Sequence, residues 1–270
     1  MSPFDKQDIL NILDQSGFKM TPGNFIKKIK SKALITTFEA KNILNQLINE
    51  QELSYHYLYG STYIEKSFLK PVRITKNFIL KPPGYQRQPG KNDIEMMIGQ
   101  GISFGSGRHP TTRLCLKALD FCFFDSGMLK LRKDLKGADI GTGSGVLAMA
   151  MCLSGLASCR AYEIDPVSMN EARKNVALNR LEKKIDLVED FMKESKNTFS
   201  IICANLRFPT LKALSCTIYK SLTKNGIAVL SGVRAWEKEN LVSSYSKTGF
   251  DLAWQKDEKK WSAFVLEKKT

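Results

Sequence analysis

The chain is predicted to be an α/β protein, with a doubly wound, mostly parallel sheet of seven strands and a small separate domain at its N-terminus. From Pro110 onward, short apolar runs alternate with helical patterns, which is typical of a parallel sheet covered by helices on both faces. Near the end, GFDLAWQKDEKKWSAFVLEKK reads as two strands joined by a tight charged turn, so the sheet is expected to close with an antiparallel hairpin. The first 68 residues follow a different pattern, of short helices and aromatic-rich strands.

Residues 1–68 predict a winged-helix-like recognition or docking domain. A glycine stop at Gly17 ends the first helix, Thr21 begins the second and Thr37 caps the third, and two aromatic-rich strands follow as a hairpin. A generic helical bundle with a hairpin is the alternative. The third helix carries few bases, so docking on protein or structured RNA is favoured over sequence-specific reading of DNA.

Residues 69–100 are expected to be a bridging β segment, with short strand patterns broken by Pro82-Pro83-Gly84 and by Pro89-Gly90. Residues 101–270 are expected to form the main domain. Its parallel strands are predicted at 137–141, 160–164, 185–189, 199–204 and 226–231.

Composition limits the classes of protein that fit. The 270 residues carry a net charge of +14 that is spread along the chain. This surplus favours an acidic partner such as RNA or a ribosomal surface, with a solvated basic surface as the alternative. No apolar run is long enough to span a membrane, and the first residues are too polar for a secretory signal. The six cysteines lack CxxC spacing and are expected to be buried thiols rather than a disulfide framework, which predicts a cytoplasmic protein without structural metal.

The stretch DIGTGSG follows the first predicted parallel strand and precedes a helix, which is where an open α/β sheet binds its ligand. Gly141, Gly143 and Gly145 allow a tight turn that brings backbone N–H groups close to a ligand. A dinucleotide fingerprint reads GxGxxG, but its third glycine falls on Val146 in this sequence. The turn therefore disfavours a nicotinamide or flavin cofactor.

Acidic residues end the next two predicted strands. Glu163 lies 22 residues after Gly141 and is placed to accept hydrogen bonds from ribose hydroxyls. The glycine turn, the acid at 163 and the closing hairpin together resemble the pattern of S-adenosyl-L-methionine-dependent methyltransferases. The resemblance implies that Asp190 and Phe191, directly after the third predicted strand, meet the adenine; a solvent-exposed strand end is the alternative.

Longer segments resemble one family. GISFGSGRHPTTRLCLKAL, ICANLRFPTLKAL, LSGVRAWEKENL and EKKWSAFVLEKK are similar to segments of the ribosomal protein L-eleven methyltransferase (PrmA) family, and the similarity spans roughly residues 69–267. The resemblance implies that Phe104 lines the cofactor pocket and that Thr112 contacts the methionine end of S-adenosyl-L-methionine. It also implies that Gly141 and its neighbours cradle the amino-acid moiety. His109, which precedes a proline, is interpreted as holding the loop rather than as a base.

The resemblance places Asn205 between the methyl donor and the acceptor. Its side-chain oxygen is suited to accept an N–H of the acceptor amine, which must be neutral to react. The following residues depart from the family pattern, because Phe208 replaces a small residue. Its ring either stacks on a planar acceptor or packs against the next helix, and Arg207 either meets an acidic substrate or lies in solvent. The first 68 residues also differ from the family's own N-terminal domain.

The leading hypothesis is a methyltransferase that modifies a protein amine, either a lysine side chain or an N-terminus, of a ribosomal or translation protein. The first alternative is a nucleic-acid (RNA) or amide-nitrogen methyltransferase. The second is an RNA- or ribosome-binding protein that keeps the fold without transferring methyl groups.

Overall fold

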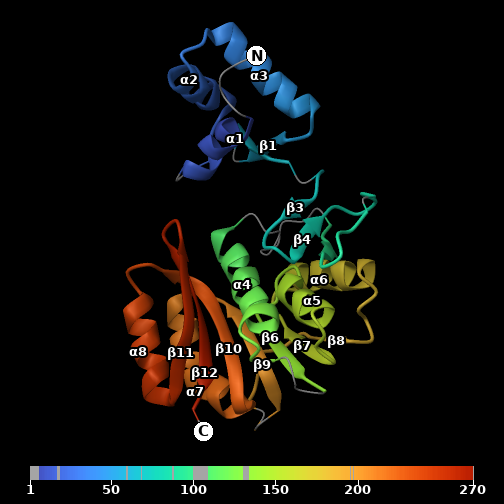
Figure 1. The fold of residues 1–270 in the computed structure, drawn as a ribbon, viewed down its shortest axis with the longest axis vertical. Coiled ribbons are helices and arrows are strands. Elements are labelled where there is room, and N and C mark those ends of the chain that lie inside the picture. The colour runs from blue at the N-terminus through green and yellow to red at the C-terminus, as the bar shows by residue number, and fades with distance from the viewer. Residues whose placement is uncertain are drawn as a thin grey trace. The chain divides into compact units, whose positions relative to one another are not determined.

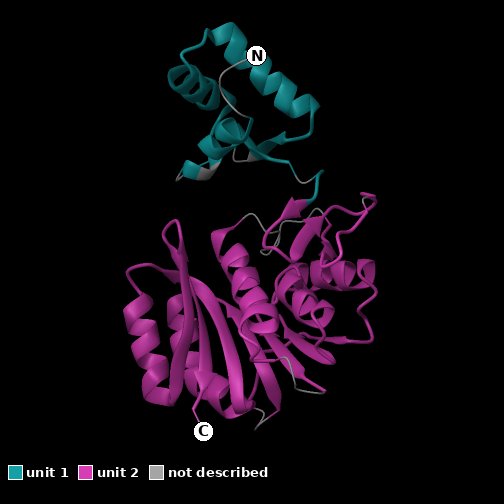
Figure 2. Cartoon of the chain, in the orientation of Figure 1, with its two compact units in different colours: residues 1–71 teal, residues 72–270 magenta. Residues whose placement is uncertain are grey.

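The structure, a computed structural model, describes residues 6–16, 19–58, 60–67, 69–86, 88–99, 109–129, 134–194, 196 and 198–269. The chain divides into two compact units, residues 1–71 and 72–270 (Figure 2). The division falls between Pro71 and Val72, whereas the sequence placed it after residue 68.

The first unit contains three helices followed by an antiparallel hairpin. These elements are α1 (Lys6–Gln15), α2 (Pro22–Ala33), α3 (Thr37–Asn49), β1 (Leu53–Leu58) and β2 (Ser61–Lys66). Met20, between α1 and α2, makes an isolated antiparallel bridge to Ile64 of β2. The unit has its own hydrophobic cluster, in which Phe25 and Leu44 are buried.

The caps of this unit correct one prediction. Thr36, not Thr37, is the N-cap of α3, because its hydroxyl accepts from the Glu39 N–H while the Glu39 carboxylate accepts from the Thr36 N–H. Thr21 caps α2 as predicted. The predicted stop at Gly17 lies outside the described residues.

The second unit begins with a small sheet of β3 (Val72–Arg73), β4 (Phe78–Lys81) and β5 (Ile94–Met97). Strands β3 and β4 are antiparallel, and β4 and β5 are parallel. Phe78, Leu80 and Met96 belong to the same hydrophobic cluster as the helices that follow. The segment expected to be a bridge is therefore part of the second compact unit.

The main sheet has seven strands in the order β11-β12-β10-β9-β6-β7-β8 (Figure 1). Strands β10, β9, β6, β7 and β8 run parallel to one another, and β12 is antiparallel to both β10 and β11. The predicted fold class is therefore confirmed. Their bounds are β6 (Lys136–Ile140), β7 (Ser158–Tyr162), β8 (Ile185–Val188), β9 (Phe199–Asn205), β10 (Leu222–Arg234), β11 (Phe250–Glu258) and β12 (Trp261–Lys268).

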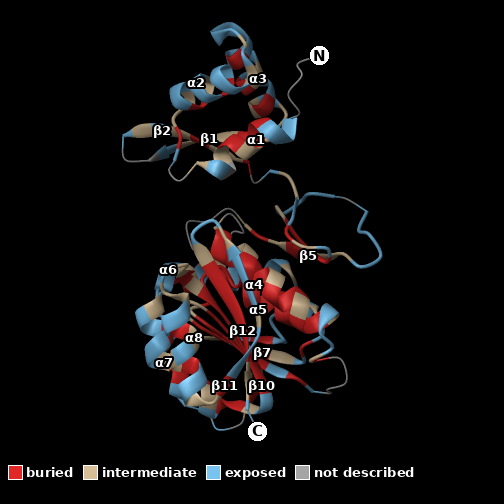
Figure 3. Cartoon of the chain, turned by 60° about the vertical axis from the view of Figure 1, so that its left-hand side comes forward, coloured by how far each residue is buried: buried red, intermediate tan, exposed pale blue. Residues whose placement is uncertain are grey.

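Helices cover both faces of this sheet and leave its central strands buried (Figure 3). The elements are α4 (Pro110–Asp120), the short π-helix η1 (Phe121–Asp125), α5 (Val146–Leu153), α6 (Pro166–Leu178), α7 (Phe208–Ser221) and α8 (Lys238–Thr248). Side chains of α4, α5 and α6 form one core cluster with the sheet, and side chains of α7 and α8 form the other.

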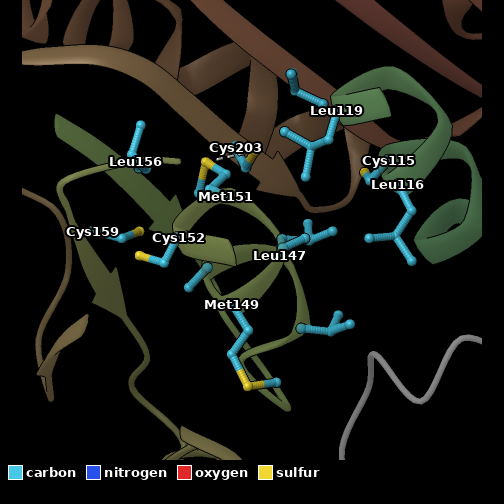
Figure 4. Close-up of a cluster of buried hydrophobic side chains, with 14 of the residues drawn as sticks. Cys115, Leu116, Leu119, Leu147, Met149, Met151, Cys152, Leu156, Cys159 and Cys203 are labelled. Carbon is cyan, nitrogen blue, oxygen red and sulfur yellow. Dashed lines mark hydrogen bonds between the residues drawn. The ribbon is translucent and has the colours of Figure 1, made fainter. Parts of the chain in front are cut away.

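The first of these clusters is rich in sulfur (Figure 4). All six cysteines are free thiols and five are buried, with Cys216 exposed. The Cys203 thiol lies 3.6 Å from the Met151 sulfur. In the described part of the chain, no helix is both long and apolar enough to cross a membrane.

Candidate active site

The glycine turn connects β6 to α5 at the carboxyl edge of the parallel strands. Gly141, Gly143 and Gly145 have φ of 70°, 58° and 84°, the left-handed region that favours glycine. The N–H groups of Gly141 and Thr142 donate to the Tyr162 carbonyl at 2.9 and 3.0 Å, which fixes the turn to the neighbouring strand β7. The tight turn that the sequence predicted is therefore present, and its first two N–H groups bond to β7.

Asp139, which the sequence analysis did not single out, forms hydrogen bonds to the glycine turn and to α5. It is buried, and its Oδ2 accepts from the Thr142 hydroxyl at 2.6 Å and from the Ala148 N–H at 3.2 Å. Burial raises the pKa of this carboxyl to about 6, against the effect of those two hydrogen bonds. The signal available in the sequence was its position, next to last in a strand and two residues before the first glycine.

Glu163 follows β7, and its carboxylate lies against the glycine turn. Its Oε2 accepts from the Gly143 N–H at 3.0 Å, and its Oε1 accepts from the N–H groups of Ile164 and Asp165 at 2.9 and 3.0 Å. Asp165 has a different task, because it caps α6 by accepting from the Ser168 N–H at 2.9 Å. Of the two acids, only Glu163 faces the turn.

Charged side chains and one exposed aromatic ring follow β8. Asp190 accepts from the Phe191 N–H at 2.7 Å and pairs with the Lys193 ammonium at 2.8 Å, which lowers the pKa of Asp190. The Phe191 side chain is 68% exposed, and Ile164, next to Glu163, is 53% exposed. Ile164 was missed by sequence reasoning. These two apolar side chains follow neighbouring strands, and exposed apolar groups there suit a flat aromatic ligand.

His109 is the N-cap of α4. Its ring accepts from the Thr111 N–H at 3.3 Å, and Nδ1 lies 2.8 Å from the Thr111 hydroxyl. The ring meets Trp261 edge-on, with centroids 4.9 Å apart. Burial lowers the pKa of His109 to about 4, with further lowering by the positive charges of Arg113, Arg234 and Lys259. His109 is therefore a neutral cap of α4, and the loop that the sequence analysis expected it to hold lies outside the described residues.

Thr112 is buried in the first turn of α4, and its hydroxyl has no hydrogen-bond partner in the described part of the chain. Phe104, the other pocket residue expected from this segment, lies outside the described residues, as do its neighbours at 100–108.

Asn205 ends β9, the strand beside β6, and its buried Oδ1 has no partner among the described residues. The next residue is tightly placed: the Leu206 N–H donates to the Ser231 carbonyl at 3.0 Å. At Gly232, with φ of 91°, an added Cβ would lie 2.2 Å from the Leu206 carbonyl oxygen. Phe208 begins α7 and packs against the core cluster formed by α7 and α8.

The structure therefore brings Gly141, Glu163 and Asn205 to the carboxyl ends of three adjacent parallel strands, β6, β7 and β9. Ligands of open α/β sheets bind at this edge. The buried oxygens of Thr112 and Asn205, which have no partner among the described residues, are suited to accept from a ligand, since such atoms are costly to leave without a hydrogen bond. No group of three or more residues able to hold a metal ion was found among the described positions.

The seven-stranded sheet with its antiparallel end and its glycine turn after β6 defines the Rossmann-like methyltransferase fold. The crystal structure of ribosomal protein L11 methylase from Lactobacillus delbrueckii subsp. bulgaricus matches it with a TM-score of 0.65, at 23% identity, over 76% of this chain and 100% of that one. The family model for ribosomal protein L11 methyltransferase (PrmA) matches residues 25–269. The chain belongs to the ribosomal protein L11 methyltransferase family, which confirms the resemblance found in the sequence.

Two curated relatives agree. The ribosomal protein L11 methyltransferase of Carboxydothermus hydrogenoformans is 33% identical over 205 residues, which are 75% of this chain and 64% of that protein. The protein of the same name from Geotalea uraniireducens is 30% identical over 210 residues, 76% of this chain and 67% of that protein. The chain thus spans about two thirds of the length of these relatives.

Proposed function

We propose that the chain is an S-adenosyl-L-methionine-dependent N-methyltransferase that modifies an amine, a lysine side chain or an N-terminus, of a ribosomal protein. The observation that carries the proposal is the Glu163 carboxylate against the Gly143 N–H. At the end of a nearby strand of the same sheet edge lies the Asn205 oxygen, which has no partner in the part of the chain that the structure describes. Membership of the family and the printed names of its relatives support the same activity.

The residues at this edge fit S-adenosyl-L-methionine. Its ribose hydroxyls are donors suited to the Glu163 carboxylate, and its ammonium group is a donor suited to uncharged oxygens such as that of Thr112. The exposed Ile164 and Phe191 suit the faces of its adenine, with Asp190 as acceptor for the exocyclic amine. Phe104 completes the proposed cofactor set, together with Gly141 and Gly143. When bound, the cofactor supplies a methyl group on a sulfonium, which is a good leaving group.

Asn205 has the main role proposed for this chain in catalysis. Its Oδ1 accepts an N–H of the incoming amine, which orients the nitrogen lone pair toward the methyl group. The nitrogen must be deprotonated first, and a partly apolar, closed pocket lowers the pKa of an amine by desolvation. The enzyme then mainly aligns the reacting atoms, and no general base on the chain is invoked.

Phe208 bears on the choice between an amine and a planar acceptor. Its ring packs against the core cluster of α7 and α8, so part of its surface is already used. A planar amide or nucleobase acceptor would need a free ring face on which to stack. The packing therefore supports an amine as the acceptor and leaves methylation of RNA or of an amide nitrogen as the second candidate. Phe208 is still proposed to line the acceptor pocket with the part of its surface that is not packed against this cluster.

The unit of residues 1–71 is proposed to be a winged-helix-like docking domain. The bridge from Met20 to Ile64 supports this class, because it adds a third extended segment to the hairpin beside three helices. The exposed lysines of α2 suit an acidic partner such as ribosomal RNA; they are Lys27, Lys28, Lys30 and Lys32. We propose that the protein works in the cytoplasm, where ribosomes are available.

Labelling tests the reaction. The purified full chain, incubated with methyl-labelled S-adenosyl-L-methionine and ribosomes from its own cells, is expected to label one protein band. Labelled RNA without labelled protein would establish the second candidate instead. Mass spectrometry of peptides from cells with and without the protein then identifies the acceptor residue.

Calorimetry tests the cofactor site. Glu163→Ala is expected to weaken binding of S-adenosylhomocysteine by about tenfold to a hundredfold, because a charged hydrogen-bond partner is lost. The matched control is Glu182→Ala, which removes an exposed acid of the same charge and is expected to leave binding unchanged. Equal affinity of wild type and Glu163→Ala would place the ribose elsewhere. No binding to the wild type at millimolar concentration would exclude every methyltransferase function.

A further inference from the structure

Two asparagines at the end of α6 hold the strand end that leads toward α4. Asn179 bonds to Met97 twice: its Oδ1 accepts from the Met97 N–H at 2.8 Å, and its Nδ2 donates to the Met97 carbonyl at 2.7 Å. Asn175, one turn earlier, accepts from the Gly99 N–H at 2.9 Å. Both side chains thus hold residues 97–99, which four residues separate from the FGSGRHPTT stretch in the sequence.

Asn175 also bonds to the glycine turn. Its Nδ2 donates to the Ser144 carbonyl at 2.8 Å, inside DIGTGSG. The side chain is buried, with 4% of its surface exposed, and it uses its acceptor on one segment and its donor on the other. One amide group therefore joins Gly99 to Ser144, two residues that lie 45 positions apart in the sequence.

We propose that Asn175 is a positioning residue for the cofactor, which rests on the function proposed above. It joins the glycine turn to residues 97–99 and so holds the turn in one position for the ligand. Loss of this amide leaves the Ser144 carbonyl and the Gly99 N–H without their described partner. The hydrogen-bonded link between the glycine turn and residues 97–99 through Asn175 is then lost. A ligand that contacts the glycine turn then has to order the turn on binding, which lowers its affinity.

Asn179 provides a matched comparison. It lies on the same side of the same helix and makes two hydrogen bonds to the same segment, but its described contacts do not include the glycine turn. Asn179→Ala is therefore expected to lower the thermal stability about as much as Asn175→Ala does. Only the Asn175 variants are expected to lose cofactor affinity.

The test is calorimetry of S-adenosylhomocysteine binding to the full chain, well below the melting temperature. Asn175→Ala is expected to raise the Kd about tenfold and Asn179→Ala less than about twofold. Asn175→Asp keeps the size of the side chain and the acceptor for Gly99, but it places a carboxylate against the Ser144 carbonyl. It is expected to raise the Kd as much as Asn175→Ala, while the Gly99 amide stays protected from hydrogen exchange measured by NMR.

Two results would overturn this role. One is wild-type affinity in Asn175→Ala or Asn175→Asp, and the other is equal weakening in Asn179→Ala, which would reduce Asn175 to general support of the fold. Both presuppose that the wild-type chain binds the probe. A wild type that binds nothing rejects the proposed function itself, so the two failures are distinguishable.

Discussion

Gly232→Ala is expected to destabilise the second unit by about 2–5 kcal/mol. The residue has φ of 91°, where an L side chain costs about 1–2 kcal/mol. Its Cβ would lie 2.2 Å from the Leu206 carbonyl oxygen and 2.7 Å from the Leu206 carbonyl carbon. Backbone atoms cannot rotate out of the way, so the segment after β9 has to shift, and such overpacking adds about 1–3 kcal/mol.

Urea unfolding followed by tryptophan fluorescence measures this loss, because all three tryptophans, at positions 236, 254 and 261, lie in the second unit. Gly155→Ala is the control. Gly155 also has a positive φ, of 112°, but its added Cβ would meet nothing within 4 Å. The difference between the two variants isolates the clash with Leu206. If Gly232→Ala costs no more than Gly155→Ala, the argument from close approach is refuted.

Three further predictions concern charge and capping. The folded-state pKa of Asp139, about 6, lies above its usual 3.8. The unfolding free energy of the wild type is therefore expected to fall relative to that of Asp139→Asn as pH rises from 4 to 6. If urea titrations show the same difference in unfolding free energy between the two proteins across that range, the prediction is contradicted. The pKa of His109, about 4 in the folded protein against 6.5 ordinarily, predicts an NMR titration midpoint far below 6.5. The unfolding free energy is expected to fall as pH falls from 6.5 to 4, because the unfolded chain then binds the proton more readily. The variant His56→Gln removes the other histidine and so assigns the signals. Thr36→Ala is expected to cost the first unit about 1 kcal/mol by far-UV circular dichroism, and a shift of the tryptophan transition instead would contradict it.

The sheet was predictable because its signals are local. Apolar runs that alternate with helical patterns predicted the parallel strands. The glycine turn after the first parallel strand predicted which edge of the sheet binds a ligand. Glu163 was singled out from the sequence, but the task of Asp165 needed the structure. Both acids follow β7, and only their backbone partners show that one faces the turn while the other caps α6.

The contacts that were missed are those between distant segments. Asn175 and Asn179 read as ordinary polar residues of a helix, since nothing near them in the sequence indicates a partner 76 or 82 positions away. Strand β10 was predicted to end at residue 231, but it continues to Arg234 through an irregularity at Gly232. Local patterns do not encode the close approach of Leu206 that this irregularity accommodates.

Leu206 has a consequence for efforts to change the acceptor of the proposed methyl transfer. The Leu206 backbone lies against Gly232. The Leu206 side chain lies against Gly141, because a Cβ added to Gly141 would be 2.6 Å from the Leu206 Cδ2. A library that varies residues 205–208 to select a new acceptor would therefore also disturb the donor side. Such libraries need to vary positions 141, 206 and 232 jointly, and fitness effects at these three sites are expected to be epistatic.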